Sequence, residues 1–136
     1  RQPMISDDGT GVLAYNGEVY NFPELRTELE NEGISFTSTG DTEVVFKSLT
    51  TWGPEKAIPR FNGMFAFAFF DRKERTLWLA RDRLGIKPIY IAECGSELFF
   101  RAEIAACASW CQTQARPFGN CGLRFAWATG CTIHFI

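Results

Sequence analysis

The 136-residue sequence has no long hydrophobic run, no marked excess of charge of either sign and only one histidine. No apolar segment approaches the roughly 20 residues that cross a bilayer, so we expect no membrane partner. The net charge of -2 gives no electrostatic reason to bind nucleic acid. No secretory signal opens the chain, and a cytoplasmic location is therefore expected.

Acidic residues and lysine are missing from the last part of the chain. Between Ala105 and Ile136 there is no Asp, Glu or Lys, whereas the preceding residues carry charge at an ordinary density. We therefore predict a tail of unknown structure over residues 107–136, and off-frame coding sequence is one explanation of its composition. Such a tail has had no selection to pack. Its removal after Ala106 should then improve solubility without lowering thermal stability.

Cysteine occurs five times, an odd number that argues for free thiols in a chain without a secretory signal. Thiolate and imidazole groups can also bind zinc, and the tail contains five residues of these types: Cys107, Cys111, Cys121, Cys131 and His134. Their spacings lack the paired C-x-x-C that is typical of zinc sites, so we predict no metal ligands. A metal-stabilised module at the C-terminus stays open as an alternative.

The stretch VLAYNGEVYN, residues 12–21, links a predicted strand to a predicted helix. Val12–Tyr15 suits a buried strand, and a proline followed by an acidic residue indicates a helix over about residues 22–32. Asn16–Gly17 has two interpretations. The dipeptide favours a hairpin turn, or it forms a polar corner whose amide side chain and backbone N–H could stabilise a developing oxyanion. Glu18 adds a carboxylate beside them.

A second helix is predicted after Thr39–Gly40, where apolar residues recur at helical spacing. Asp41 lies at its start, and one interpretation is that this residue is an N-cap of the helix and nothing more. Ile34–Phe36 alternates with polar residues and is predicted to be a short strand. A short helix should follow over residues 55–60.

Phe61–Asp71 is predicted to be a strand that is apolar on both faces. Because alternate residues point to opposite faces, three phenylalanines would share one face: Phe65, Phe67 and Phe69. The sheet that contains this strand must therefore be covered on both sides. A charged hairpin leads to a strand over residues 76–80, and two more strands are predicted near residues 89–91 and 98–100. The pattern is mixed α/β and strand-rich in the middle.

Four motifs in this order closely resemble the glutaminase domain of glutamine-hydrolysing asparagine synthetases: Tyr15–Asn21, Gly40–Glu43, Phe61–Phe67 and Ala80–Pro88. The resemblance covers residues 1–106. Four separate motifs make it specific, and the long match over Ala80–Pro88 favours this branch over other class II glutamine amidotransferases.

The resemblance implies an α+β fold, the four-layer αββα sandwich of the N-terminal-nucleophile hydrolases, incomplete at its N-terminus. It also implies an enzyme in which the thiol of an N-terminal cysteine cleaves glutamine and supplies ammonia to a synthetase domain that forms asparagine. The domain itself would need no cofactor, because ATP and magnesium would belong to the synthetase domain. Glutamine and that missing synthetase domain are the implied partners, and a homodimer is compatible with the full-length protein.

The same resemblance assigns site residues one by one. Asn16 and Gly17 correspond to the oxyanion hole, and Glu18 and Asp41 to anchors of the glutamine amino group. Each role is chemically reasonable, because fixed donors stabilise the charge that builds on an attacked amide, and a carboxylate suits an ammonium.

The sequence departs from the family pattern where the nucleophile is concerned. None of the five cysteines is N-terminal, so the nucleophilic cysteine is absent from this sequence, and we expect this chain alone to be inactive. A non-catalytic binding or scaffolding domain with the same fold is therefore a second interpretation.

Overall fold

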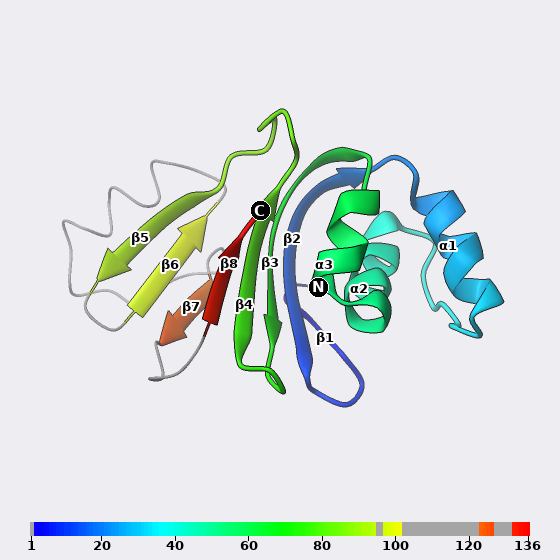
Figure 1. Cartoon of the computed structure of the whole chain (residues 1–136), viewed down its shortest axis with the longest axis horizontal. Helices are drawn as coiled ribbons and strands as arrows, with labels where there is room; N and C mark the ends of the chain where they lie inside the picture. The colour runs from blue at the N-terminus through cyan, green and yellow to red at the C-terminus, as the bar shows by residue number, and fades with distance from the viewer. Residues whose placement is uncertain (1, 95–96, 102–122, 127–131) are drawn as a thin grey trace.

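The computed structural model describes residues 2–94, 97–101, 123–126 and 132–136. A five-stranded sheet forms its centre, in the order β1-β2-β3-β4-β8. The strands are β1 (Met4–Ile5), β2 (Gly11–Val19), β3 (Gly63–Asp71), β4 (Thr76–Arg81) and β8 (Thr132–Phe135). The first four pair antiparallel along the chain, whereas β8 pairs parallel with β4. Figure 1 shows β8 beside β4, at the edge of this sheet.

A second sheet contains three antiparallel strands, β5 (Tyr90–Cys94), β6 (Glu97–Arg101) and β7 (Leu123–Ala126). Phe100 of this sheet and Ile89 just before it pack against Ala68, Leu77 and Leu79 of the first sheet. The face of the first sheet that bears these residues is therefore partly covered by the second sheet.

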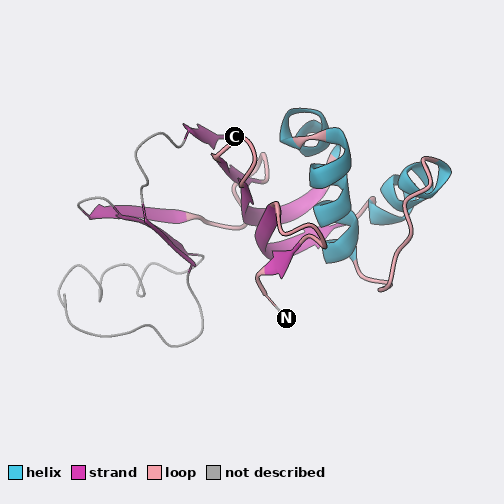
Figure 2. Cartoon of the chain, turned by 90° about the horizontal axis from the view of Figure 1, so that it is seen from below, coloured by secondary structure: helices cyan, strands magenta, loops and turns pink. Residues whose placement is uncertain are grey.

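Three α-helices lie on the opposite face of the five-stranded sheet, as Figure 2 shows. They are α1 (Phe22–Asn31), α2 (Asp41–Trp52) and α3 (Pro54–Ala57), and a 3-10 helix, η1 (Ile58–Arg60), follows. The predicted helices are thus present, with the third one divided. In α1, Leu25 and Leu29 are spaced by one turn and are both buried, which gives the helix one apolar side.

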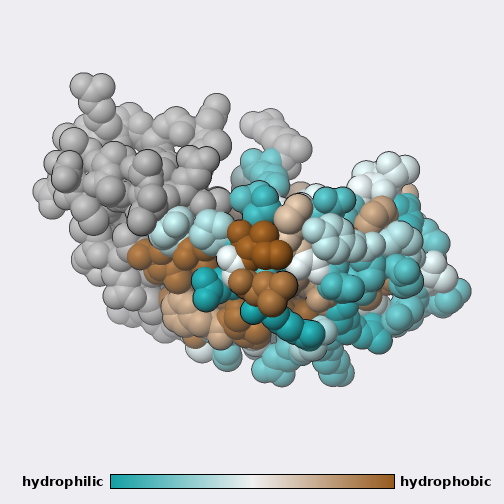
Figure 3. Space-filling model, turned by 90° about the horizontal axis from the view of Figure 1, so that it is seen from above, coloured by the Kyte–Doolittle hydropathy of each residue, from teal (hydrophilic) through white to brown (hydrophobic). Residues whose placement is uncertain are grey.

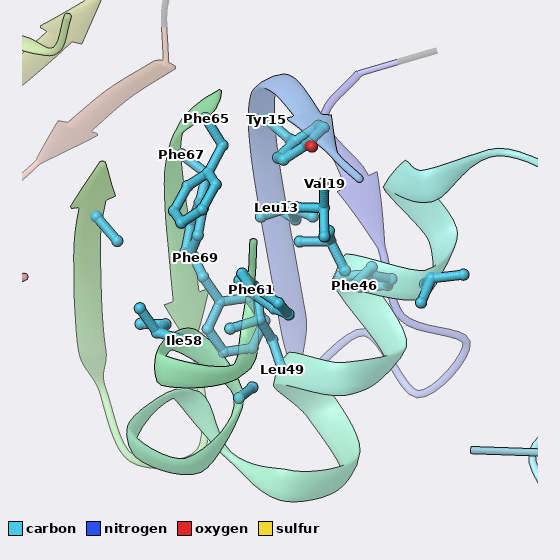
Figure 4. Packing of buried hydrophobic residues seen from close by; sticks show 14 of the residues in the cluster. Leu13, Tyr15, Val19, Phe46, Leu49, Ile58, Phe61, Phe65, Phe67 and Phe69 are labelled. Carbon is cyan, nitrogen blue, oxygen red and sulfur yellow. The ribbon is translucent and has the colours of Figure 1, made fainter. Parts of the chain in front are cut away.

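The main core lies between the helices and the sheet. Phe65, Phe67 and Phe69 all point into it, as the alternation predicted, and they are 2–4% exposed. Phe61 meets Phe65 edge to face, with 5.8 Å between ring centroids, and Phe65 stacks on Phe67 at 5.7 Å. Figure 4 shows Phe61 beside Leu49 of α2, with Phe65 and Phe67 farther along β3. The prediction of a strand that is buried on both faces is confirmed, because Ala66 and Ala68 are also buried.

The predicted strand at Ile34–Phe36 is wrong, because the structure has no strand in this segment. Side chains of α2 hold the segment in an irregular path. The buried carboxylate of Glu43 accepts the backbone N–H groups of Thr37 and Ser38 at 3.0 Å and 2.6 Å. Nζ of Lys47 also donates to the carbonyl oxygen of Ser35, so side chains of α2 bind backbone groups within this segment and directly after it.

Part of the predicted tail belongs to the two sheets, since β7 and β8 lie within residues 107–136. In β8 the imidazole of His134 stacks on Trp78, with ring centroids 4.1 Å apart. The four cysteines of the tail lie outside the described residues. Within the described ranges, no group of three His, Cys, Asp or Glu could hold a metal ion. No helix in these ranges is both long and apolar enough to cross a membrane.

Surface polarity differs along the molecule. Figure 3 shows hydrophilic residues over the part that contains the helices, and hydrophobic residues gathered in the middle of the view. The exposed hydrophobic side chains include Leu84 and Ile86, which lie in the loop after β4 and are 85% and 54% exposed.

Candidate active site

Strand β2 contains three of the four site residues that the resemblance assigns. Asn16, Gly17 and Glu18 lie inside this strand and pair with β3, with Gly17 opposite Phe65. The strand continues to Val19, so the predicted sharp corner at Asn16–Gly17 is wrong, and so is the hairpin alternative. Pairing with the long apolar strand β3 keeps these residues extended, and this tertiary context outweighs the local turn preference.

The side chains of β2 alternate between two faces of the sheet. Tyr15 and Val19 are buried among the core residues on the helix-covered face, and Figure 4 shows both of them there. Asn16 and Glu18 are exposed and, by the same alternation, project from the opposite face. An amide and a carboxylate are therefore presented to solvent from neighbouring positions on one face.

The backbone of β2 has one uncovered position on the edge that faces away from β3. In an antiparallel pair, the N–H and C=O groups of alternate residues point to the same edge. On this edge Tyr15 donates its N–H to Oε1 of Gln2 at 2.9 Å, and Val19 donates its N–H to Oδ2 of Asp41 at 3.0 Å. Gly17 lies between them, and its N–H has no hydrogen-bond acceptor among the residues that the structure describes. One backbone donor thus stands open between Gln2 and Asp41.

Two constraints require glycine at this position. Gly17 has a φ of 154°, which residues with a side chain rarely adopt. A Cβ atom there would lie 2.2 Å from the carbonyl oxygen of Met64 and 2.5 Å from Cα of Phe65. Gly63 meets the same limit from the other strand, since its Cβ would lie 2.1 Å from the carbonyl oxygen of Glu18. The two strands therefore approach too closely at this point for a side chain on either glycine.

Helix α2 brings Asp41, its first residue, to the end of β2. Oδ2 of Asp41 accepts the Tyr15 hydroxyl at 2.6 Å as well as the N–H of Val19. Gly40 is the N-cap of α2 and no side chain caps this helix, so the interpretation of Asp41 as an N-cap is wrong. Burial, followed by the hydrogen bond to Asp41, raises the pKa of Tyr15 above its ordinary value. The Tyr15 hydroxyl therefore remains a donor at neutral pH.

Asp82, in the loop after β4, binds the backbone of β3 on the side away from β2. The motifs in the sequence did not assign this residue a role. Its carboxylate is 4% exposed and accepts four backbone N–H groups, those of Phe65, Leu84, Ile86 and Lys87. Burial by itself would raise the pKa of Asp82, but these four donors outweigh it and lower the pKa. Asp82 fixes the backbone of β3 directly opposite Gly17. The signal in the sequence is an Asp that follows an apolar strand and precedes a glycine turn.

The chemistry of the site suits a ligand that carries both a carbonyl and an ammonium group. Gly17 offers a backbone N–H, and Asn16 adds an amide side chain next to it in the strand. Asp41 lies at the same end of β2, since it binds the N–H of Val19, and Glu18 precedes that residue. Two donors and two carboxylates therefore lie near the end of one strand, with Asn16 and Glu18 on one face and Asp41 at the edge where Gly17 has its open N–H.

Two solved structures share this fold. The glutamine phosphoribosylpyrophosphate amidotransferase from B. subtilis matches with a TM-score of 0.58 and 18% sequence identity, over 97% of this chain and 33% of that one. The allosteric regulatory enzyme of purine biosynthesis matches with a TM-score of 0.59 and the same identity, over 97% and 32%. This likeness confirms the expected fold class. The described residues show one helical layer and the two sheets of the sandwich.

The chain belongs to the family of glutamine amidotransferase domains, whose model matches residues 1–120. The match continues beyond residue 106, where the motif resemblance ends.

Among curated relatives, the glutamine-hydrolyzing asparagine synthetase 3 of Bacillus subtilis (strain 168) is 42% identical over 118 residues, which is 85% of this chain and 19% of the relative. Asparagine synthetase B of Escherichia coli (strain K12) is 35% identical over 113 residues, 82% of this chain and 20% of the relative. A putative asparagine synthetase of Mycobacterium tuberculosis (strain ATCC 25618 / H37Rv) is 48% identical over 82 residues, 60% and 12%. The chain therefore spans about a fifth or less of the length of these relatives.

Proposed function

We propose that this domain hydrolyses glutamine to glutamate and ammonia, as the glutaminase part of an asparagine-forming synthetase. The observation that carries the proposal is the open N–H of Gly17, held on the edge of β2 beside the fixed carboxylate of Asp41. At one strand end, an N–H that can donate to a carbonyl and a carboxylate that can accept from an ammonium match the two ends of an amino acid that bears a side-chain carboxamide.

The reaction follows from these groups together with the N-terminal cysteine thiol that the resemblance implies. The thiolate attacks the carboxamide carbon, and negative charge develops on the amide oxygen, where Gly17 and Asn16 donate hydrogen bonds. The C–N bond breaks, the leaving nitrogen takes a proton and departs as ammonia, and a thioester remains. Water then cleaves the thioester and releases glutamate. Fixed donors of this kind act without reorganising during the reaction, which is why they lower the barrier.

Two carboxylates fix the other end of the substrate. Asp41 is anchored to β2 through Oδ2, and Glu18 is exposed beside the same strand end. In our proposal both carboxylates accept the α-ammonium group of glutamine. The ammonia would be consumed by a synthetase domain that uses ATP and magnesium, and the cytoplasmic location and a homodimer remain predictions of the same kind.

The test measures glutamate release from glutamine by the full-length gene product and its Asn16→Ala variant. Loss of one oxyanion donor should lower kcat by about 100- to 1,000-fold. The melting temperature should change little, because surface substitutions usually alter the free energy of unfolding by about 0.5 kcal/mol or less. Asn31→Ala, which removes an exposed asparagine at the end of α1, is the matched control and should retain full turnover. Unchanged turnover in Asn16→Ala would remove that residue from the oxyanion hole. No glutamate release by the unmodified full-length protein would instead support the non-catalytic binding domain.

A further inference from the structure

The buried hydroxyl of Tyr15 and the site carboxylate of Asp41 are joined by a short hydrogen bond. We propose that Tyr15 is a positioning residue, which orients Asp41 so that the site selects ligands with an α-ammonium group. The inference rests on the proposed glutaminase function. It assigns a role to Tyr15, which has no role in that function as proposed above. Tyr15 acts through Asp41 and does not itself contact the ligand.

The two oxygens of Asp41 have different surroundings. Oδ2 accepts the Tyr15 hydroxyl at 2.6 Å and the N–H of Val19 at 3.0 Å, so two donors occupy it. Oδ1 receives only the Thr42 hydroxyl, at a long 3.4 Å, among the described residues. The carboxylate is thus held mainly through Oδ2, which leaves Oδ1 as the oxygen that our proposal assigns to the ammonium group.

The position of Tyr15 in β2 explains why this bond can set the geometry of the site. Tyr15 and Val19 lie two residues before and two residues after Gly17, and both of them bind Asp41. The same strand therefore sets the backbone donor for the carbonyl and, through Asp41, the acceptor for the ammonium. Tyr15 itself is 5% exposed and packed in the main core, so its ring has little freedom to move.

Among the described residues, removing the hydroxyl leaves Val19 as the only donor to Oδ2, and the carboxylate can then rotate about its side-chain bonds. The ammonium would meet a less ordered acceptor, so binding should weaken, whereas the reacting carboxamide would still meet Gly17 and Asn16. The binding of a ligand without an ammonium group should not be affected by the loss of the hydroxyl. This difference separates a positioning role from a general loss of structure.

The experiment uses the full-length gene product with two substrates, glutamine and glutaramate, which is glutamine without its amino group. Tyr15→Phe should lower kcat/KM for glutamine by about tenfold, mainly through KM, because hydrogen bonds to charged groups are among the stronger ones in proteins. The value for glutaramate should stay unchanged. Tyr20→Phe is the matched control, since Tyr20 directly follows the same strand and is 54% exposed, and kcat/KM for either substrate should not change.

A second variant keeps the inference testable if Tyr15→Phe folds poorly. Asp41→Asn should strongly reduce the preference for glutamine over glutaramate, with Glu18 supplying what remains, and adding Tyr15→Phe to it should change the preference no further. An equal loss for both substrates in folded Tyr15→Phe protein, or no loss for glutamine, would overturn the positioning role alone. Absence of glutamine hydrolysis in the unmodified full-length protein would overturn the proposed function, and this inference with it.

Discussion

The two faces of the central sheet differ in the kind of side chain that they carry. On the helix-covered face, β2 and β3 supply large groups such as Tyr15, Val19 and Phe67, which are almost fully buried. On the opposite face the same strands supply Ala66 and Ala68, and β2 ends there in exposed polar side chains. Because side chains alternate along a strand, one pair of strands builds a close-packed core on one side and presents polar groups on the other.

This difference shows how the site obtains its rigidity. The polar side chains of β2 are exposed, but they share a backbone with residues that the core holds in place. Asp82 adds to this by binding the backbone of β3 at Phe65, opposite Gly17. Substitutions in the helix-covered core and substitutions near the site should therefore differ in how much they change the free energy of unfolding.

The largest effect on stability is expected from a cavity in the helix-covered face. Phe67 is 2% exposed and contacts the rings of Phe61 and Phe65. Phe67→Ala should lower the free energy of unfolding by about 3 to 5 kcal/mol, measured by urea denaturation. Met64→Ala removes a half-buried side chain from the opposite face of the same strand, and it should cost less than about 2 kcal/mol. Equal losses in the two variants would contradict the assignment of the main core to one face.

A smaller but still large effect is expected where β2 and β3 approach each other. Gly17→Ala would place a methyl group 2.2 Å from the carbonyl oxygen of Met64, and the strands must separate to accept it. We expect a loss of about 2 to 4 kcal/mol in unfolding free energy, from strain and overpacking together. Gly33→Ala is the control, because Gly33 also has a positive φ, of 88°, but nothing within 4 Å of a Cβ. It should lose only about 1 to 2 kcal/mol, and an equal loss in both variants would show that crowding at Gly17 has no effect.

Removal of residues 132–136 tests the edge of the sheet. The composition of the tail predicts no loss of thermal stability when it is removed, but β8 pairs with β4 and His134 stacks on Trp78. We therefore expect the melting temperature to fall by several degrees, the scale of about 1 kcal/mol in a domain of this size. The tryptophan fluorescence of the chain should also change, because the indole of Trp78 loses its stacked neighbour. An unchanged melting temperature would favour a tail that does not contribute to the fold.

The smallest effect is expected from pH, through Glu43. Burial by itself would raise the pKa of Glu43, but hydrogen bonds from Ser38 and Thr37 outweigh it and lower the pKa from 4.5 to about 2. A lowered pKa in the folded state means that Glu43 stabilises the fold above pH 4.5, and that this contribution disappears as the pH falls toward about 2. Melting temperatures of the unmodified chain and of Glu43→Gln should therefore differ at pH 6 and converge near pH 2. The exposed Glu55→Gln should show no such convergence.

Several elements could be predicted from the sequence because their determinants are local. The proline and acidic residue at the start of α1, and the alternation in β3, each depend on residues a few positions apart. The motif resemblance likewise indicated the family and the fold class, which the comparisons then showed. The segment Ile34–Phe36 was predicted wrongly, because its alternation resembles a strand, whereas the carbonyl of Ser35 within it is bound by Lys47 of a helix.

The residue types of the site were determined by the sequence alone: an amide at Asn16, a glycine at Gly17 and a carboxylate at Asp41. The tertiary structure decided their geometry. Only the pairing with β3 shows that Gly17 lies inside a strand with its N–H on the open edge, and only the packing of α2 against β2 joins Asp41 to Tyr15. The physical reason is that hydrogen bonds between residues far apart in the chain depend on how the strands and helices pack. Local preferences, such as that of Asn-Gly for a turn, yield to this packing.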